Sequence, residues 1–86
     1  MNQAIQFPDR EFWDNERQAV CFPAQVNGFH LTCAIAALTL RQRYGSGASD
    51  LELFRSHRWD IEEEAEALIE QQQEDDQGWV WLSSAK

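Results

Sequence analysis

The Asn27-Gly28 dipeptide, which lies between two β-rich runs, constrains the fold of this chain more than any other local feature. Asn-Gly is the preferred pair for a two-residue type I′ turn, because both turn positions need a positive φ. With this turn, the runs 17–26 and 29–36 pair as a hairpin in one register. The pairs that then face each other on one side are all apolar: Val26 with Phe29, Ala24 with Leu31, Phe22 with Cys33 and Val20 with Ile35. Because side chains alternate along a strand, they form one face, which we expect to be the core face.

The two cysteines of the hairpin, Cys21 and Cys33, point to opposite faces of the sheet in this register, which disfavours a disulfide between them. Neither has a Cys-x-x-Cys partner or a histidine at ligand spacing, so zinc or redox chemistry is not indicated. We expect two reduced thiols, with Cys33 a small core residue and Cys21 the more accessible one. Reduced thiols and the lack of a visible export signal predict a cytoplasmic protein.

Pro23 predicts that the first run of the hairpin is an edge of the sheet. It falls opposite Thr32 at a non-hydrogen-bonded pair, where its missing N–H would have pointed away from the partner strand. The run 17–26 is therefore an edge, at least around this proline. We expect a short strand over residues 4–7 to pair beside the early half of the run and to stop before Pro23.

Helices are predicted after the hairpin. Residues 36–44 hold good helix formers, and Ser49-Asp50-Leu51-Glu52 has the pattern of a capping box that begins a second helix. From there an apolar stripe interrupted by Arg58 favours one helix of about six turns over residues 50–73. A break near Trp59 is the alternative.

Residues 79–82 are predicted to form the final strand, paired beside the second run of the hairpin because the first run is an edge. Trp79 and Trp81 point to one side of it, and Val80 and Leu82 point to the other. Only one pair can face the helices. An exposed tryptophan pair would mark an interface, whereas a buried pair would belong to the core, and the sequence favours neither.

These elements predict the α+β fold class: a small antiparallel sheet, in the order β-β-β-α-α-β, with two helices packed on one face. We expect that face to be lined by Phe22, Phe29, Leu31 and Ile35. Residues 1–86 are expected to form one domain, because two cores do not fit in this length. The hydrophobic fraction of 43% argues against disorder. No apolar run approaches the roughly 20 residues of a membrane span, so no membrane partner is predicted.

Acidic residues are concentrated in the second half of the chain. Residues 1–43 hold four acids and four arginines, whereas residues 50–76 hold eleven acids and two arginines. The net charge of −8 opposes direct binding to nucleic acid. The carboxylates lack EF-hand spacing, so no metal site is predicted, but a densely charged helix suits docking to a basic protein. The candidate partner-binding residues are Glu62, Glu63, Glu66, Glu70, Trp79 and Trp81.

Arg58 interrupts the apolar stripe of the predicted helix. Its expected structural use is an ion pair with Glu62, four residues further on. A charged group on an apolar face needs a partner, and Arg58 with His57 is therefore also a candidate anchor for an anionic ligand. Cys21 would be the third group of such a site.

Short motifs follow one another along nearly the whole chain. They are Ile5-x-Phe7, Trp13-Asp14, Ala19-Val20 before Phe22, Gly28, Cys33, then Leu53-Phe54, Arg58-x-Asp60-Ile61-Glu62 and Ala65, and finally Gln77-Gly78. In this order and spacing the chain resembles a family of short, mostly proteobacterial proteins known as domain of unknown function 1488. The resemblance implies a compact α+β fold. It brings no activity, ligand or catalytic residue.

The chain shows no nucleophile–base pair, no phosphate-binding loop and no metal constellation, so neither catalysis nor a cofactor is predicted. Our leading hypothesis is a non-enzymatic protein-binding or regulatory module. One alternative is a small binder of anionic ligands or a minor enzyme subunit. Another is a structural homodimer, joined through the edge strand or the tryptophans.

Overall fold

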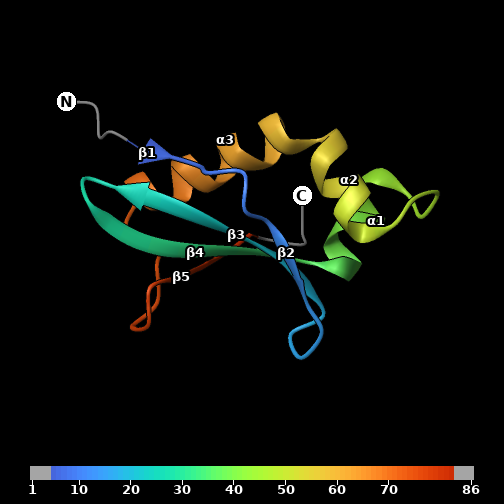
Figure 1. The fold of residues 1–86 in the computed structure, drawn as a ribbon, viewed down its shortest axis with the longest axis horizontal. Helices are drawn as coiled ribbons and strands as arrows, with labels where there is room; N and C mark the ends of the chain where they lie inside the picture. The colour runs from blue at the N-terminus through green and yellow to red at the C-terminus, as the bar shows by residue number, and fades with distance from the viewer. Residues whose placement is uncertain (1–4, 83–86) are drawn as a thin grey trace.

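The chain, described over residues 5–82 by a computed structural model, folds into one mixed sheet with its helices on one face (Figure 1). The elements in chain order are β1 (Ile5–Gln6), β2 (Phe12–Asp14), β3 (Ala19–Val26), β4 (Phe29–Ala36), α1 (Ala37–Tyr44), α2 (Asp50–Ser56), α3 (Arg58–Glu70) and β5 (Trp79–Trp81). The strand order is β1-β3-β4-β5, and β2 also pairs with β3. The predicted α+β class is confirmed.

The central hairpin of β3 and β4 has the predicted register. Val26 pairs with Phe29, and the ladder continues to the pair of Ala19 with Ala36. Asn27 and Gly28 adopt φ values of 51° and 89°, as the type I′ turn requires. The local turn chemistry thus sets which side chains of both strands face the core.

The outer side of β3 is occupied by two short strands with a gap between them. β1 pairs with Gln25 and Val26, and β2 pairs with Ala19 to Cys21. Pro23 lies in the gap, because it has no N–H to donate outward. The edge prediction around Pro23 is confirmed, but the predicted place of the first strand is wrong. β1 lies beside the late half of β3, and β2 takes the early half; Ala4 lies outside the described residues.

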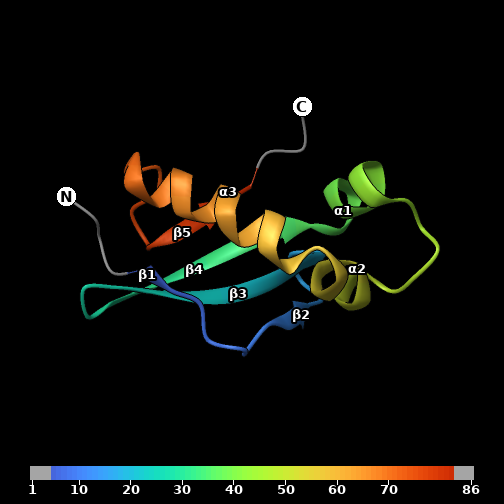
Figure 2. The same cartoon turned by 90° about the horizontal axis from the view of Figure 1, so that it is seen from above.

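The predicted antiparallel sheet is wrong for its last strand. β5 lies beside β4, as expected, but runs parallel to it, with Cys33 opposite Val80. Between these strands the chain passes through α1, α2 and α3, all on one face of the sheet (Figure 2). A crossover of this kind returns the chain to the starting end of the sheet, so the next strand runs parallel.

The predicted helix over residues 50–73 is divided in two. α2 begins at the predicted capping box, in which the Ser49 hydroxyl accepts from the Glu52 N–H at 3.2 Å. His57, with φ −120° and ψ 25°, leaves the helical conformation and separates α2 from α3. Its ring stacks on Tyr44 at the end of α1, with centroids 3.7 Å apart. Within residues 5–82, three helices therefore occur where two were expected.

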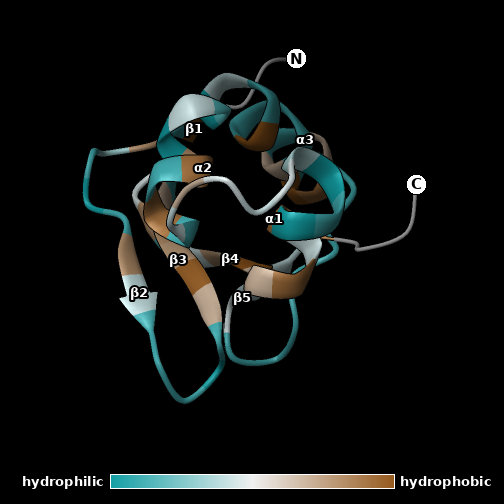
Figure 3. Cartoon of the chain, turned by 90° about the vertical axis from the view of Figure 1, so that its right-hand side faces the viewer, coloured by the Kyte–Doolittle hydropathy of each residue, from teal (hydrophilic) through white to brown (hydrophobic). Residues whose placement is uncertain are grey.

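The core fills the space between the sheet and the helices, and Figure 3 shows the hydrophobic segments of β3 and β4. The core side chains that the sheet contributes on this face include Val20, Phe22, Ala24, Cys33, Ile35 and Val80; those of the helices include Leu40, Phe54, Ile61 and Ala65. Phe29 was expected on this covered face but is 74% exposed, because it flanks the turn at the hairpin tip. Within residues 5–82, none of the helices has the length and hydropathy to cross a membrane.

Candidate protein-binding surfaces

A groove of about 440 Å³ runs between β1 and α3. Ile5 and Phe7 form its apolar wall, on and just after β1. The opposite wall belongs to the first turns of α3. Its lining residues are Trp59, Asp60, Glu62, Glu63 and Glu66. The groove therefore combines an apolar surface, an aromatic ring and carboxylates along one line.

The helical period of α3 explains why these side chains share one wall. Ile61, Ala65 and Ile69 are buried against the sheet, at intervals of four residues. Trp59 and Glu63, also four residues apart, are therefore exposed on another side of the helix. Trp59 is 86% exposed, an unusual state for the largest apolar side chain.

Ion pairs divide the carboxylates of α3 into two kinds. Glu62 contacts Arg58 at 3.3 Å, which confirms the predicted pair, and Glu64 binds Arg43 through two bonds of 2.7 and 3.1 Å. Burial raises the pKa of Glu62, although the hydrogen bond from Arg58 acts in the opposite direction. The remaining acids of α3, which make no ion pair with any described residue, are Asp60, Glu63, Glu66 and Glu70.

Arg58, the predicted ligand anchor, lies in a cluster of charges from this chain. Its guanidinium is 2.7 Å from Glu11 and 3.3 Å from Asp9, in addition to Glu62. Arg55 binds Glu11 as well, at 2.8 Å. Burial by itself would raise the pKa of Glu11, but the hydrogen bond from Arg55 and the adjacent Arg58 guanidinium lower it to about 2. These acids balance the positive charge of Arg58, which is the role that an anionic ligand would otherwise fill.

The three groups of the candidate anion site are not brought together. His57 stacks on Tyr44 beside Arg58, but Cys21 lies on the opposite face of the sheet, in a small buried cluster against which Trp79 packs. The expectation that Cys21 is accessible is wrong, because both thiols are fully buried, and Trp79 packs against the cluster that contains Cys21. Both cysteines are free, as predicted. Burial raises the pKa of Cys21 to about 11 and that of Cys33 to about 12.

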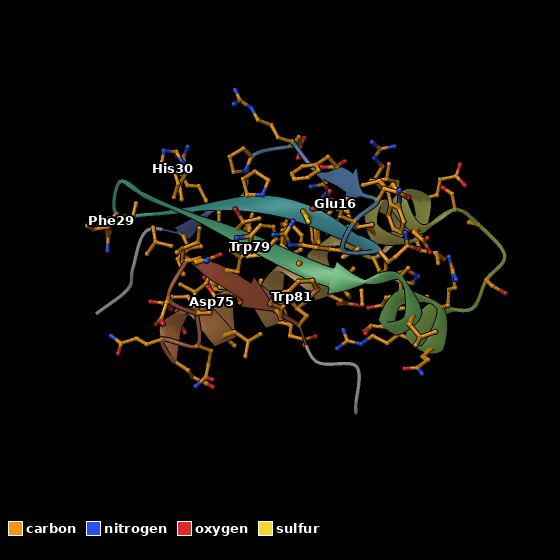
Figure 4. All side chains as sticks on the ribbon, turned by 90° about the horizontal axis from the view of Figure 1, so that it is seen from below. Glu16, Phe29, His30, Asp75, Trp79 and Trp81 are labelled. Carbon is orange, nitrogen blue, oxygen red and sulfur yellow. The ribbon has the colours of Figure 1, made fainter. Side chains whose placement is uncertain are left out.

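The structure decides which pair of the last strand faces the core. Val80 and Leu82 are buried under the helices, and Trp79 and Trp81 lie on the open face of the sheet (Figure 4). The two indoles stack with centroids 6.2 Å apart, and the guanidinium of Arg17 lies 4.3 Å above the Trp79 ring. Trp81 is 44% exposed. The tryptophan pair is thus a second candidate surface, separate from the groove.

Sequence reasoning missed the groove itself. It identified the acids of α3, but Trp59 entered only as the place of a helix break. The four-residue spacing of Trp59 and Glu63 would have placed them on one side of the helix. Nothing in the sequence indicated that Ile5 and Phe7 form the facing wall. Within residues 5–82, no three histidine, cysteine or acidic side chains are close enough together to hold a metal ion.

Comparison with known proteins identifies the family. The family model described as protein of unknown function (DUF1488) matches residues 5–82. The chain belongs to the DUF1488 family. This confirms the resemblance drawn from the motifs.

Relatives within DUF1488 match nearly the full length. The chain is 62% identical to the uncharacterized protein YrdB of Escherichia coli (strain K12), over 95% of this chain and 99% of the relative. The uncharacterized protein YrdB of Shigella flexneri is 61% identical over the same shares. The crystal structure of a DUF1488 protein of unknown function from Shewanella loihica PV-4 has a TM-score of 0.88 and 37% identity, covering 95% of this chain and 94% of that chain.

Proposed function

We propose that this DUF1488 protein is a non-enzymatic, cytoplasmic binding module that holds a basic segment of a protein partner in the groove between β1 and α3. One observation carries the proposal: the groove places the 86%-exposed Trp59 beside carboxylates that have no cationic partner among the described residues. Exposed aromatic side chains of this size are typical of binding hot spots.

The chemistry of the two walls defines the kind of segment that fits. A lysine or arginine side chain has an apolar stem and a charged head. Its stem can pack on Ile5 and Phe7, while its head reaches Glu63 or Glu66 across the groove. A guanidinium stacked on Trp59 would add a cation–π contact of about 1 kcal/mol. The groove thus favours a cation with a hydrophobic stem over a small inorganic ion.

The charge of the helix adds a long-range attraction. Asp60, Glu63, Glu66 and Glu70 lie on one helix and are not neutralised by a described arginine. Such a field accelerates encounter with a basic protein and weakens as salt screens it, over a distance of about 8 Å at physiological ionic strength. Binding at this surface is therefore expected to be salt-sensitive.

The test is an affinity pull-down from a lysate of the native host, at low and raised salt, with mass spectrometry of the captured proteins. We expect a stoichiometric basic partner that wild-type protein retains and that Glu63→Lys and Trp59→Ala proteins lose. The matched control is Glu16→Lys, which makes the same charge change at an exposed position outside the groove. A partner that all variants retain equally would refute the proposal.

A further inference from the structure

Within residues 5–82, the outer edge of β5 has one residue whose main chain is open. The Thr32 N–H donates to the Gly78 carbonyl at 3.0 Å, and the Leu82 N–H donates to the Ala34 carbonyl at 2.9 Å. The even-numbered residues of this segment therefore direct their main chain toward β4. In a strand, the intervening residues Trp79 and Trp81 direct theirs to the outer edge.

Asp75 occupies the first half of this edge. Its carboxylate accepts from the Trp79 N–H at 2.9 Å, and its own N–H donates to the Trp79 carbonyl at 2.8 Å. This closes the edge at Trp79 and protects it from pairing with another chain. The N–H and C=O of Trp81 form no such bond with any residue between 5 and 82. A single strand-pairing position is therefore left beside the exposed indole of Trp81.

The two indoles of β5 are covered to different extents. Arg17 lies over the ring of Trp79, so this face of the sheet already contains one stacked guanidinium. Trp81 has no cation over its ring among the described residues and is 44% exposed. A second guanidinium above Trp81 would extend the existing arrangement and gain the same cation–π attraction.

The negative charge around the β5 edge opposes pairing with a second copy of this chain and favours a cationic strand. From Trp59 to Leu82 the chain has no lysine or arginine, and the turn before β5 contains Glu74, Asp75 and Asp76. Pairing of this edge with the same edge of a second copy would bring two acidic turns and two acidic helices together. Like-charge contact opposes that pairing, whereas a cationic strand has the complementary charge.

From the open main chain of Trp81, its uncovered indole and the acidic turn, we infer that the β5 edge accepts an extended, arginine-bearing segment of a protein partner by strand addition. The segment donates to and accepts from the Trp81 main chain, and an arginine on its open side stacks on the indole. Main-chain pairing supplies affinity, and the arginine supplies specificity. This site is at the opposite end of the strand order from β1 and does not depend on the groove.

The test uses a defined probe, an alternating peptide Arg-Val-Arg-Val-Arg with blocked ends, titrated into isotope-labelled protein. We expect the amide and indole N–H signals of Trp81 to shift. A peptide N-methylated at its central residues keeps its charge but loses strand pairing, and should bind about tenfold more weakly, as the loss of two hydrogen bonds implies. Trp81→Ala should weaken binding, while Glu63→Lys, in the groove, should leave the Trp81 shifts in place.

Three results would overturn the inference. Equal binding of the N-methylated peptide would show attraction without strand pairing. Shifts confined to Ile5, Phe7 and Trp59 would assign the peptide to the groove, which would leave the proposed function standing. A wild-type dimer that Trp81→Ala dissociates, seen by sedimentation, would assign the edge to a second copy. Conversely, shifts at Trp81 with none in the groove would support strand addition at the β5 edge and would count against the proposed function of the groove.

Discussion

The Arg58 guanidinium lies 2.7 Å from the Glu11 carboxylate, and this contact fastens the segment before β2 to the start of α3. Arg55, at the end of α2, binds the same carboxylate at 2.8 Å. Glu11 is only 7% exposed at its side chain, so two helices and the segment before β2 meet at one buried negative charge. The groove wall at Phe7 belongs to the same segment, so this contact also positions the groove.

Replacement of Glu11 by glutamine is expected to destabilise the protein in a pH-dependent way. The folded-state pKa of about 2 lies below the ordinary value of 4.5. A lowered pKa stabilises the fold at pH values above 4.5, and this contribution is lost as the pH falls toward 2. Urea unfolding should show a cost of about 2 kcal/mol for Glu11→Gln at pH 7. The difference from wild type should shrink between pH 5 and pH 3, whereas Glu16→Gln should show little difference at either pH.

The ion pair between Arg43 and Glu64 should contribute measurably to stability. It joins α1 to α3 through two hydrogen bonds, with side chains 14% and 21% exposed. A double-mutant cycle with alanine should give a coupling energy of about 1 kcal/mol. The control is Arg41 with Asp50, which has similar geometry but a half-exposed arginine. Its coupling should be about 0.3 kcal/mol, and equal values for the two pairs would contradict the role of burial.

The two thiols should be unreactive in the folded protein. Cys21 and Cys33 are fully buried, so a thiol reagent in solution cannot reach them. Their pKa values of about 11 and about 12 also mean that little of the reactive thiolate exists near neutral pH. A chromogenic disulfide reagent at pH 8 should modify them at the rate of unfolding and should modify both quickly in urea. Rapid modification of one thiol in native protein would contradict the burial of that thiol.

Alanine substitutions on the two faces of β5 should differ in their cost to the free energy of unfolding. Val80→Ala removes fully buried apolar volume and should cost about 2 kcal/mol in the free energy of unfolding. Trp81→Ala removes a ring from the open face and should cost less than about 1 kcal/mol. Thermal unfolding of both variants measures the difference. The reverse order of the two effects would mean that the tryptophans, and not Val80 and Leu82, pack under the helices.

Local chemistry made part of this fold predictable. The Asn27-Gly28 turn determined the register of β3 with β4, and the missing N–H of Pro23 marked the gap on its outer side. The direction of β5 was not predictable in the same way, because it depends on how the helices route the chain. The helix takes the alternative offered by the sequence, a break near Trp59, and the break falls at His57, whose ring stacks on Tyr44.

The candidate surfaces were predictable only in part for a similar reason. The acids of α3 can be counted in the sequence, but their ion pairs with Arg43 and Arg58 decide which of them are left to meet a partner. The groove also needs β1 to lie beside α3, which no pattern around Ile5 indicates. The prediction that Cys21 is accessible was wrong because the sequence did not show which face of the sheet Trp79 lies on. Trp79 lies on the same face as Cys21 and packs against its cluster.

The parallel pairing of β5 with β4 has a consequence for the order of folding. The β3–β4 hairpin can form within microseconds from neighbouring residues, because its turn is local. β5 meets β4 only after residues 37–78 have been arranged, so its pairing carries the larger loop-closure cost. We therefore expect the indoles of Trp79 and Trp81 to reach their final environment late. In a variant that keeps only these two of the four tryptophans, their fluorescence is expected to change after the hairpin has formed.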